Sequence, residues 1–224
     1  MQGKLFIIEG LDGSGKETQT KKLYERLQQE SYKIKKVEFP NYKSDSSALV
    51  KMYLNGDFGR NADDVDAYIS STFYAVDRYA SYKTEWEGFY QEGGIILADR
   101  YTSSNMVHQA SKIDDKKERQ QFLDWLESLE FDMYRIPRPD KVIFINMPPG
   151  YSSMLMARRD NKITGEAKKD IHESDLEYLT KSYTSAMEIA KMYKWPIIDC
   201  VEEDKLLSID AIHHKIYQEI KKDI

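Results

Sequence analysis

Residues 9–16, with the sequence EGLDGSGK, carry two glycines and a lysine at the spacing of a phosphate-binding Walker A loop. Gly10 and Gly15 allow the backbone to turn its N–H groups inward around the phosphates of a nucleotide, and Lys16 adds a mobile positive charge. An apolar run precedes the loop and a helix-forming segment follows it, as such a loop requires. We therefore expect a phosphate site here rather than a glycine-rich turn that merely connects a strand to a helix.

The residue after this lysine departs from the usual pattern, because Glu17 stands where Ser or Thr normally holds magnesium. Without that hydroxyl, a magnesium ion must be held mainly by water, phosphate oxygens and other carboxylates, since it favours an octahedral oxygen shell and keeps several waters. Glu9 and Asp12 are nearby candidates. Thr18 is a weaker one, because the next residue of a helix points about 100° away.

Short apolar runs alternate with amphipathic segments along the chain, which predicts alternating strands and helices. The expected strands are residues 4–9, 34–39, 95–98, 141–147 and 196–200. The expected helices are residues 16–30, 48–54, 64–90, 116–129, 174–193 and 209–220. Because parallel strands need right-handed crossovers that cover the sheet, this order predicts an α/β fold, a P-loop three-layer α/β/α sandwich with a five-stranded parallel sheet. Asp99 and Arg100 follow the third strand, at the end where open α/β sheets place their ligands.

The length and composition indicate one globular domain. A chain of 224 residues, 41% hydrophobic and 32% charged, can bury one sizeable core, so we expect residues 1–224 to form a single domain. Residues 157–173 are polar and strongly charged with little to bury, and we expect them to form a mobile lid.

Several features favour a cytoplasmic protein. No apolar stretch approaches the ~18 residues of a membrane span, and the N-terminus does not resemble a signal peptide. Cys200 is the single cysteine and cannot form an intrachain disulfide. A net charge of −5 and a pI near 5.5 give no general electrostatic reason to bind polymeric nucleic acid or an anionic membrane.

Further short motifs follow the phosphate loop in a fixed order along nearly the whole chain. They are Phe39-Pro40, YAVDR at 74–78, Asp99-Arg100-Tyr101 with Ser104-Asn105, PRPD at 137–140, and a basic segment before Asp170. In this order and spacing the chain resembles the thymidylate kinases, which are P-loop nucleoside monophosphate kinases. The resemblance implies ATP- and Mg²⁺-dependent transfer of the γ-phosphoryl group to dTMP, giving dTDP, by a homodimer.

The resemblance also implies roles for individual residues. Those expected to contact ATP are Gly10, Leu11, Asp12, Gly13, Ser14, Gly15, Lys16, Glu17 and Thr18. Those expected around the acceptor nucleotide are Asp12, Phe39, Pro40, Tyr42, Tyr74, Arg78, Arg100, Ser104, Asn105, His108, Asp170 and Glu173. The carboxylates expected near magnesium are Glu9, Asp12, Asp99 and Asp170. Asp12, Lys16 and Arg100 are the expected catalytic residues outside the lid, with Lys16 on the ATP phosphates and Arg100 on the acceptor phosphate.

Arg78 matches the arginine that reads the base in this family, with Tyr74 in the place of a stacking ring. By itself, an arginine on a helix is better interpreted as a surface residue paired with Asp77 or Glu85. Only the resemblance reverses that preference.

The lid carries two further catalytic candidates. Gly13 stands where some family members have an arginine, and this chain resembles the members that supply a transition-state arginine from the lid. Arg158 and Arg159 are then the candidates, and the sequence does not choose between them. The supporting charges are Lys162, Lys168 and Lys169. A solvated basic surface is the alternative.

Three positions depart from the family pattern and affect the acceptor more than the fold. Asn41 replaces a residue that is often charged, His108 one that is often aromatic, and Ile171 a frequent lid arginine. Two alternatives therefore stay open: a kinase for another deoxynucleotide or a deoxynucleoside, and a nucleotide-binding regulator without catalysis.

Overall fold

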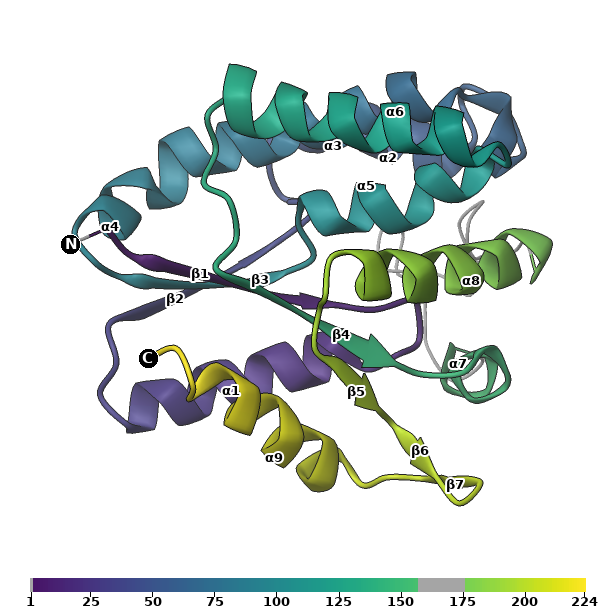
Figure 1. Ribbon diagram of the computed structural model, residues 1–224. Coiled ribbons are helices and arrows are strands. Elements are labelled where there is room, and N and C mark those ends of the chain that lie inside the picture. Colours follow the sequence, from purple (N-terminus) through teal and green to yellow (C-terminus); the bar gives the residue numbers. More distant parts are fainter. Residues whose placement is uncertain (1, 157–175) are drawn as a thin grey trace.

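Five parallel strands form the central sheet of the computed structural model, which describes residues 2–156 and 176–224 (Figure 1). The strands are β1 (Lys4–Glu9), β2 (Ile34–Glu38), β3 (Ile95–Asp99), β4 (Lys141–Asn146) and β5 (Ile197–Asp199). They are ordered β2-β3-β1-β4-β5, and every neighbouring pair is parallel. The predicted five-stranded parallel sheet is confirmed, and its central strand is the one that leads into the glycine-rich loop.

Helices cover both faces of the sheet (Figure 1). One face carries α1 (Lys16–Gln29) and α9 (Ile209–Ile220), and the other carries α3 (Ala67–Ser81), α5 (Thr102–His108), α6 (Lys116–Glu127) and α8 (Leu176–Met192). Side chains of β1 alternate between the two layers, since successive strand residues point to opposite faces. Phe6 and Ile8 belong to the core cluster that contains Leu23 of α1, whereas Leu5 and Ile7 belong to the cluster on the other face. This arrangement is the predicted three-layer sandwich.

The remaining elements are shorter. They are η1 (Asp45–Ser47), α2 (Ala48–Asn55), η2 (Ala62–Asp64), η3 (Tyr82–Trp86), α4 (Glu87–Gln91), η4 (Ala110–Lys112), η5 (Ser128–Met133), α7 (Pro149–Met156), β6 (Val201–Glu202) and β7 (Lys205–Leu206). The elements η3 and η5 are π-helical turns that continue α3 and α6. In the part of the chain described here, no helix is both long and apolar enough to span a membrane.

Several boundaries differ from the sequence-based expectation. The helix expected over 64–90 begins at Ala67, because Asp66 caps it with a carboxylate that accepts two backbone N–H groups. The expected helix ending at residue 129 continues as the π-helical turn of η5. Pro148 and Pro149 end β4 as expected, but α7 starts at once, since proline fits the first position of a helix. The expected lid, residues 157–173, lies outside the described residues.

Candidate active site

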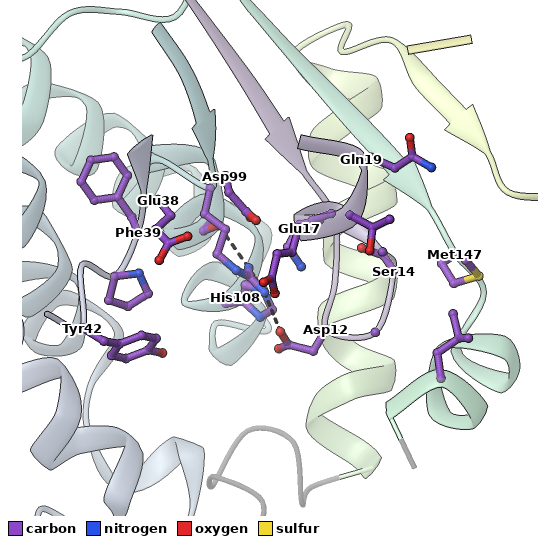
Figure 2. Close-up of a pocket in the computed structure, with 18 of the residues that line it drawn as sticks. Asp12, Ser14, Glu17, Gln19, Glu38, Phe39, Tyr42, Asp99, His108 and Met147 are labelled. Atoms are coloured by element: carbon purple, nitrogen blue, oxygen red, sulfur yellow. Dashed lines mark hydrogen bonds and ion pairs between the residues drawn. The ribbon is translucent and has the colours of Figure 1, made fainter. Parts of the chain in front are cut away.

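A cavity of about 490 Å³ opens at the edge of the sheet where β1, β2 and β3 end. Figure 2 shows the phosphate loop between two walls, with Phe39 and Tyr42 on one side and Met147 on the other. Its volume lies within the range of about 300–1,000 Å³ that small-molecule sites usually have. The cavity is therefore large enough for a nucleotide-sized ligand, and its lining continues on both sides of the loop.

The phosphate loop between β1 and α1 requires its glycines. Gly15 caps α1 with φ 84°, a left-handed conformation that glycine adopts without a steric penalty. At Gly10, an added Cβ atom would lie 2.7 Å from Ser14 Oγ and 3.0 Å from the carbonyl oxygen of Ile145. Ser14 Oγ is buried and makes no hydrogen bond to the described residues. The loop thus presents a buried hydroxyl and the N-terminus of α1 to an anion.

Lys16 lies in this loop with its charge almost fully removed from water. Its Nζ donates to the carbonyl oxygen of Leu11 at 2.8 Å, and the residue is 7% exposed. Burial, followed by the nearby charge of Arg100, lowers the pKa of Lys16 to about 8. A bound phosphate would replace the missing solvation and raise this pKa again.

Arg100 follows β3 and is aimed across the cavity by its backbone. It has φ 66°, the left-handed region that non-glycine residues seldom adopt, and its N–H donates to the carbonyl oxygen of Ile8. Residues in that region cost about 1 kcal/mol or more and are concentrated at functional sites. The backbone at Arg100 is thus held in an unfavourable conformation that directs its side chain into the cavity.

Four side chains surround the Arg100 guanidinium. Nη2 donates to Asp12 at 2.7 Å, and Nη1 donates to Ser104 Oγ at 3.2 Å. Nη1 also lies 3.0 Å from His108 Nε2 and 3.6 Å from a Glu9 oxygen. Because a guanidinium only donates, His108 Nε2 is the acceptor in this contact. Burial alone would lower the pKa of Arg100, but the carboxylates of Asp12, Glu9 and Asp99 raise it, so the cation stays charged.

Glu9 is the predicted magnesium carboxylate whose surroundings favour direct coordination least. It is fully buried and does not line the cavity. One of its oxygens accepts the Gly10 N–H at 2.9 Å, and the other accepts the hydroxyls of Ser103 and Ser104 at 2.7 Å each. Glu9 instead holds the start of the loop and the start of α5 together.

The carboxylates that do line the cavity suit a magnesium ion that is held mostly by phosphate oxygens and water. Asp12, Glu17 and Asp99 line it, yet the described residues contain no group of three carboxylate, histidine or cysteine side chains arranged around a metal. Magnesium commonly uses one or two carboxylates, phosphate oxygens and water. The donor set therefore fits an ion that arrives with the phosphates of a nucleotide.

Arg78 occupies the other end of the cavity and is not a surface residue. It is 1% exposed and forms a two-point ion pair with Glu130. The interpretation of Arg78 as a surface arginine paired with Asp77 or Glu85 is therefore wrong. Asp77 instead accepts the Asn41 N–H at 2.8 Å, and Glu85 accepts from the Asn41 side chain.

The structure gathers most of the predicted site residues around this one cavity. The predicted residues that line it are Asp12, Gly13, Ser14, Gly15, Lys16, Glu17, Thr18, Phe39, Pro40, Tyr42, Tyr74, Arg78, Asp99, Arg100, Ser104, Asn105 and His108. Gly10 and Leu11 belong to the loop but not to the cavity lining. The predicted residues outside the described part of the chain are Arg158, Arg159, Asp170 and Glu173.

Other lining residues were missed by the sequence analysis. Glu38 ends β2, and Gln109 follows α5, where its side-chain oxygen accepts the Ser70 hydroxyl at 2.7 Å. Gln109 lies four residues after Asn105, and this helical spacing could have indicated it. The apolar lining beyond the loop consists of Met147, Leu155, Leu206, Leu207, Ile209 and Ile212. Leu155, Leu206 and Leu207 come from short elements or a loop without periodicity, and no sequence signal placed the predicted α9 residues Ile209 and Ile212 beside them.

A parallel sheet with a glycine-rich phosphate loop at its carboxyl edge, and with a lysine and an arginine in one cavity, defines a P-loop nucleotide-binding protein of the phosphoryl-transferring class. A family model described as Thymidylate kinase matches residues 8–216. The chain belongs to the thymidylate kinase family, as its motifs predicted.

Named relatives and solved structures agree with this assignment. The chain is 24% identical to the thymidylate kinase of Plasmodium falciparum over 221 residues, which cover 99% of this chain and 91% of the relative. It is 26% identical to the thymidylate kinase of Mycobacterium tuberculosis over 187 residues, 83% of this chain and 85% of the relative. The thymidylate kinase structure of Candida albicans superposes with a TM-score of 0.71 at 22% identity, covering 99% of this chain and 92% of the other. At that identity the structural likeness shows the fold.

Proposed function

We propose that this chain transfers the γ-phosphoryl group of ATP to dTMP, giving ADP and dTDP. The observation that carries the proposal is the meeting of Lys16 and Arg100 in one cavity, close enough for the charge of one to lower the pKa of the other. Two cations so close are unfavourable in an empty site. They become favourable when two sets of phosphates must approach each other.

Each cation has its own task in the transfer. An oxygen of the dTMP phosphate attacks the γ-phosphorus, and the bond from that phosphorus to the β,γ-bridging oxygen breaks, which releases ADP. Lys16 and the loop N–H groups hold the ATP phosphates, and Arg100 holds the acceptor phosphate in line. Asp12 keeps the Arg100 guanidinium oriented through their 2.7 Å ion pair. Magnesium, held by phosphate oxygens with Asp12 or Asp99 nearby, would neutralise phosphate charge.

The two ends of the cavity suit the two nucleotides. Beyond the phosphate loop, the apolar side chains from Met147 and from the β7–α9 region offer a surface for adenine. At the other end, Phe39, Tyr74 and Arg78 offer two rings and hydrogen-bond donors for the acceptor base. Arg158 and Arg159 of the lid are proposed to supply the further transition-state charge.

We extend the proposal to the oligomeric state and the cellular location of the protein. Exposed apolar side chains on α2 and α3 support a homodimer, and the composition supports a cytoplasmic location.

A coupled assay of ADP release tests the proposed function. The acceptors are dTMP, dUMP, dGMP, dCMP and thymidine, and we expect dTMP to give the highest kcat/KM. A higher value with another acceptor would assign a different kinase, and no acceptor-dependent release would leave a nucleotide-binding regulator. Replacing Arg158 and Arg159 together by Ala should lower turnover more than ATP affinity, whereas equal losses would place them in ground-state binding.

A further inference from the structure

Glu130 is a buried carboxylate that contacts the lining of the cavity through Arg78. One of its oxygens accepts a hydrogen bond from Arg78 Nε at 2.7 Å, and the other accepts one from Nη2 at 2.6 Å. The side chains of Arg78 and Glu130 are 1% and 0% exposed. Arg78 lines the cavity and Glu130 does not. Glu130 therefore lies behind the arginine, separated from any ligand.

Glu130 is itself held in place before a ligand binds. Thr102, at the start of α5, donates its hydroxyl at 2.9 Å to the same Glu130 oxygen that accepts from Arg78 Nε. The Glu130 main-chain oxygen accepts the N–H of Ile136 at 3.1 Å. The arginine comes from α3, the hydroxyl from α5 and the carboxylate from η5. Three elements thus fix the orientation of one carboxylate.

This fixed carboxylate determines the direction of the Arg78 guanidinium. A guanidinium is planar, so binding its Nε and Nη2 edge also sets where its remaining nitrogen points. Among the described residues, that nitrogen, Nη1, makes a single long contact of 3.5 Å with the carbonyl oxygen of Tyr101. It is the Arg78 nitrogen least committed to the protein.

The pair also sets the charge at this end of the cavity. A buried arginine without a partner would carry an uncompensated charge and attract anions. Paired with Glu130, it presents hydrogen-bond donors with little net charge. Such a group suits the carbonyl oxygen of an uncharged base, and it rejects an exocyclic amino group in the same place because both would donate.

We propose that Glu130 is a positioning residue for recognition of the acceptor base: it orients Arg78 and neutralises it, and so controls nucleobase selectivity without touching the nucleotide. The proposal rests on the proposed function, because it assumes that the acceptor is a pyrimidine monophosphate. It makes selectivity depend on a residue 52 positions away from the arginine.

A double-mutant cycle on Arg78 and Glu130 tests this. Steady-state kcat and KM are measured with dTMP, dCMP and ATP for the parent chain, Glu130→Gln, Arg78→Met and the double variant. We expect Glu130→Gln to raise the KM for dTMP about tenfold or more, the usual effect of losing a hydrogen bond to a charged group, with the KM for ATP within about twofold. In the Arg78→Met background, the same change should leave the KM for dTMP within about twofold.

Two other variants separate positioning from general stability. Glu127→Gln removes a surface Arg–Glu pair at the end of α6 and should leave every constant unchanged. Thr102→Val keeps the ion pair but removes the hydroxyl from Glu130, and it should raise the KM for dTMP about threefold. If Glu130→Gln does not fold, the KM of Thr102→Val for dTMP tests the role of Glu130 instead.

Failure of the proposed function and failure of the role proposed for Glu130 give different results. A parent chain that does not phosphorylate dTMP overturns the proposed function. With an active parent, an equal rise in the KM for dTMP in both Arg78 backgrounds, a matching rise for ATP, or no rise in a folded variant overturns the role of Glu130.

Discussion

Each charged group in the cavity depends on its neighbours for its protonation and direction. Arg100 keeps its charge because three carboxylates surround it, whereas Lys16 has lost much of its preference for the charged form. Of these two residues, Arg100 is a permanent cation and Lys16 titrates near pH 8. Binding of phosphates must restore the charge on Lys16.

This difference predicts that ATP binding takes up a proton at alkaline pH. In the free protein the pKa of Lys16 is about 8, so Lys16 is mostly neutral at pH 9. Bound phosphates favour its charged form and raise the pKa, so affinity is constant well below pH 8 and falls by up to about tenfold per pH unit above it.

Calorimetry in two buffers with different ionisation enthalpies measures this uptake at pH 9. ATP is then fully ionised, so its own phosphate does not contribute. Lys16→Met should bind ATP weakly and without proton uptake. Equal binding enthalpies in both buffers for the parent chain would contradict the low pKa.

A second residue-scale prediction concerns the shape of the Arg100 side chain. Arg100→Lys keeps the charge but loses the fork that reaches Asp12 and Ser104 at the same time. We expect kcat/KM for dTMP to fall about 100-fold, in the range typical for loss of a transition-state donor. The control is Arg138→Lys, an exposed arginine outside the cavity. An unchanged kcat/KM in Arg100→Lys would remove Arg100 from the proposed mechanism.

At the residue scale, the sequence indicated the charged side chains of the site but not the residues that form hydrogen bonds with them. Lys16 and Arg100 were predicted because loop spacing and strand ends define their positions. The partner of Arg78 was not, because Glu130 lies in a π-helical turn and looks like one of many charges in an amphipathic helix. The partners of Asp77 were missed for the same reason: tertiary contacts carry no local spacing.

At the scale of elements, α3 connects the two parts of the acceptor end. Arg78 contacts η5, while the preceding residue, Asp77, contacts the segment after β2. The Asp77 oxygens accept the Asn41 N–H at 2.8 Å and the Ser46 hydroxyl at 2.6 Å. Asp77 therefore fixes the loop that begins with Phe39, and with it one wall of the cavity.

Loosening this loop should affect the acceptor and spare ATP. In Asp77→Ala both accepting oxygens are removed, so both hydrogen bonds are lost. We expect the KM for dTMP to rise about tenfold, with the KM for ATP unchanged. Glu92→Gln, which removes an exposed ion pair with Lys33, is the control. A rise in the KM for ATP of the same size would argue against a local role.

The sequence predicted long helices with a regular apolar pattern and missed the short elements. The helix expected at residues 209–220 matches α9, because isoleucines at four-residue spacing bury one side of it. By contrast, α5, α7 and the β6–β7 hairpin were not expected, since they are too short for a repeating pattern. Two of these missed elements, α7 and the hairpin, provide part of the apolar wall of the cavity.

At the scale of the whole molecule, several exposed apolar side chains share the surface of the neighbouring helices α2 and α3. On α3, Ile69, Val76 and Tyr79 are 54%, 44% and 40% exposed and lie at the spacing of one helix face. On α2, which packs against α3, Leu49 and Met52 are 44% and 40% exposed. Surfaces of this kind commonly mark an interface, which supports the proposed homodimer.

Charges placed on this face should therefore separate the dimer. Sedimentation of the parent chain should give twice the monomer mass of 26.2 kDa, and the double variant Ile69→Glu/Val76→Glu should give 26.2 kDa itself, because two-fold symmetry brings like charges together at the interface. Met192→Glu, which adds a charge at an equally exposed position at the end of α8, should remain a dimer. A parent chain that sediments as a monomer at micromolar concentration, or a double variant that stays dimeric, would place the interface elsewhere or remove it. The helix α3 also carries Asp77 and Arg78 on its buried side. A monomeric variant that keeps its fold should therefore show a raised KM for dTMP and an unchanged KM for ATP.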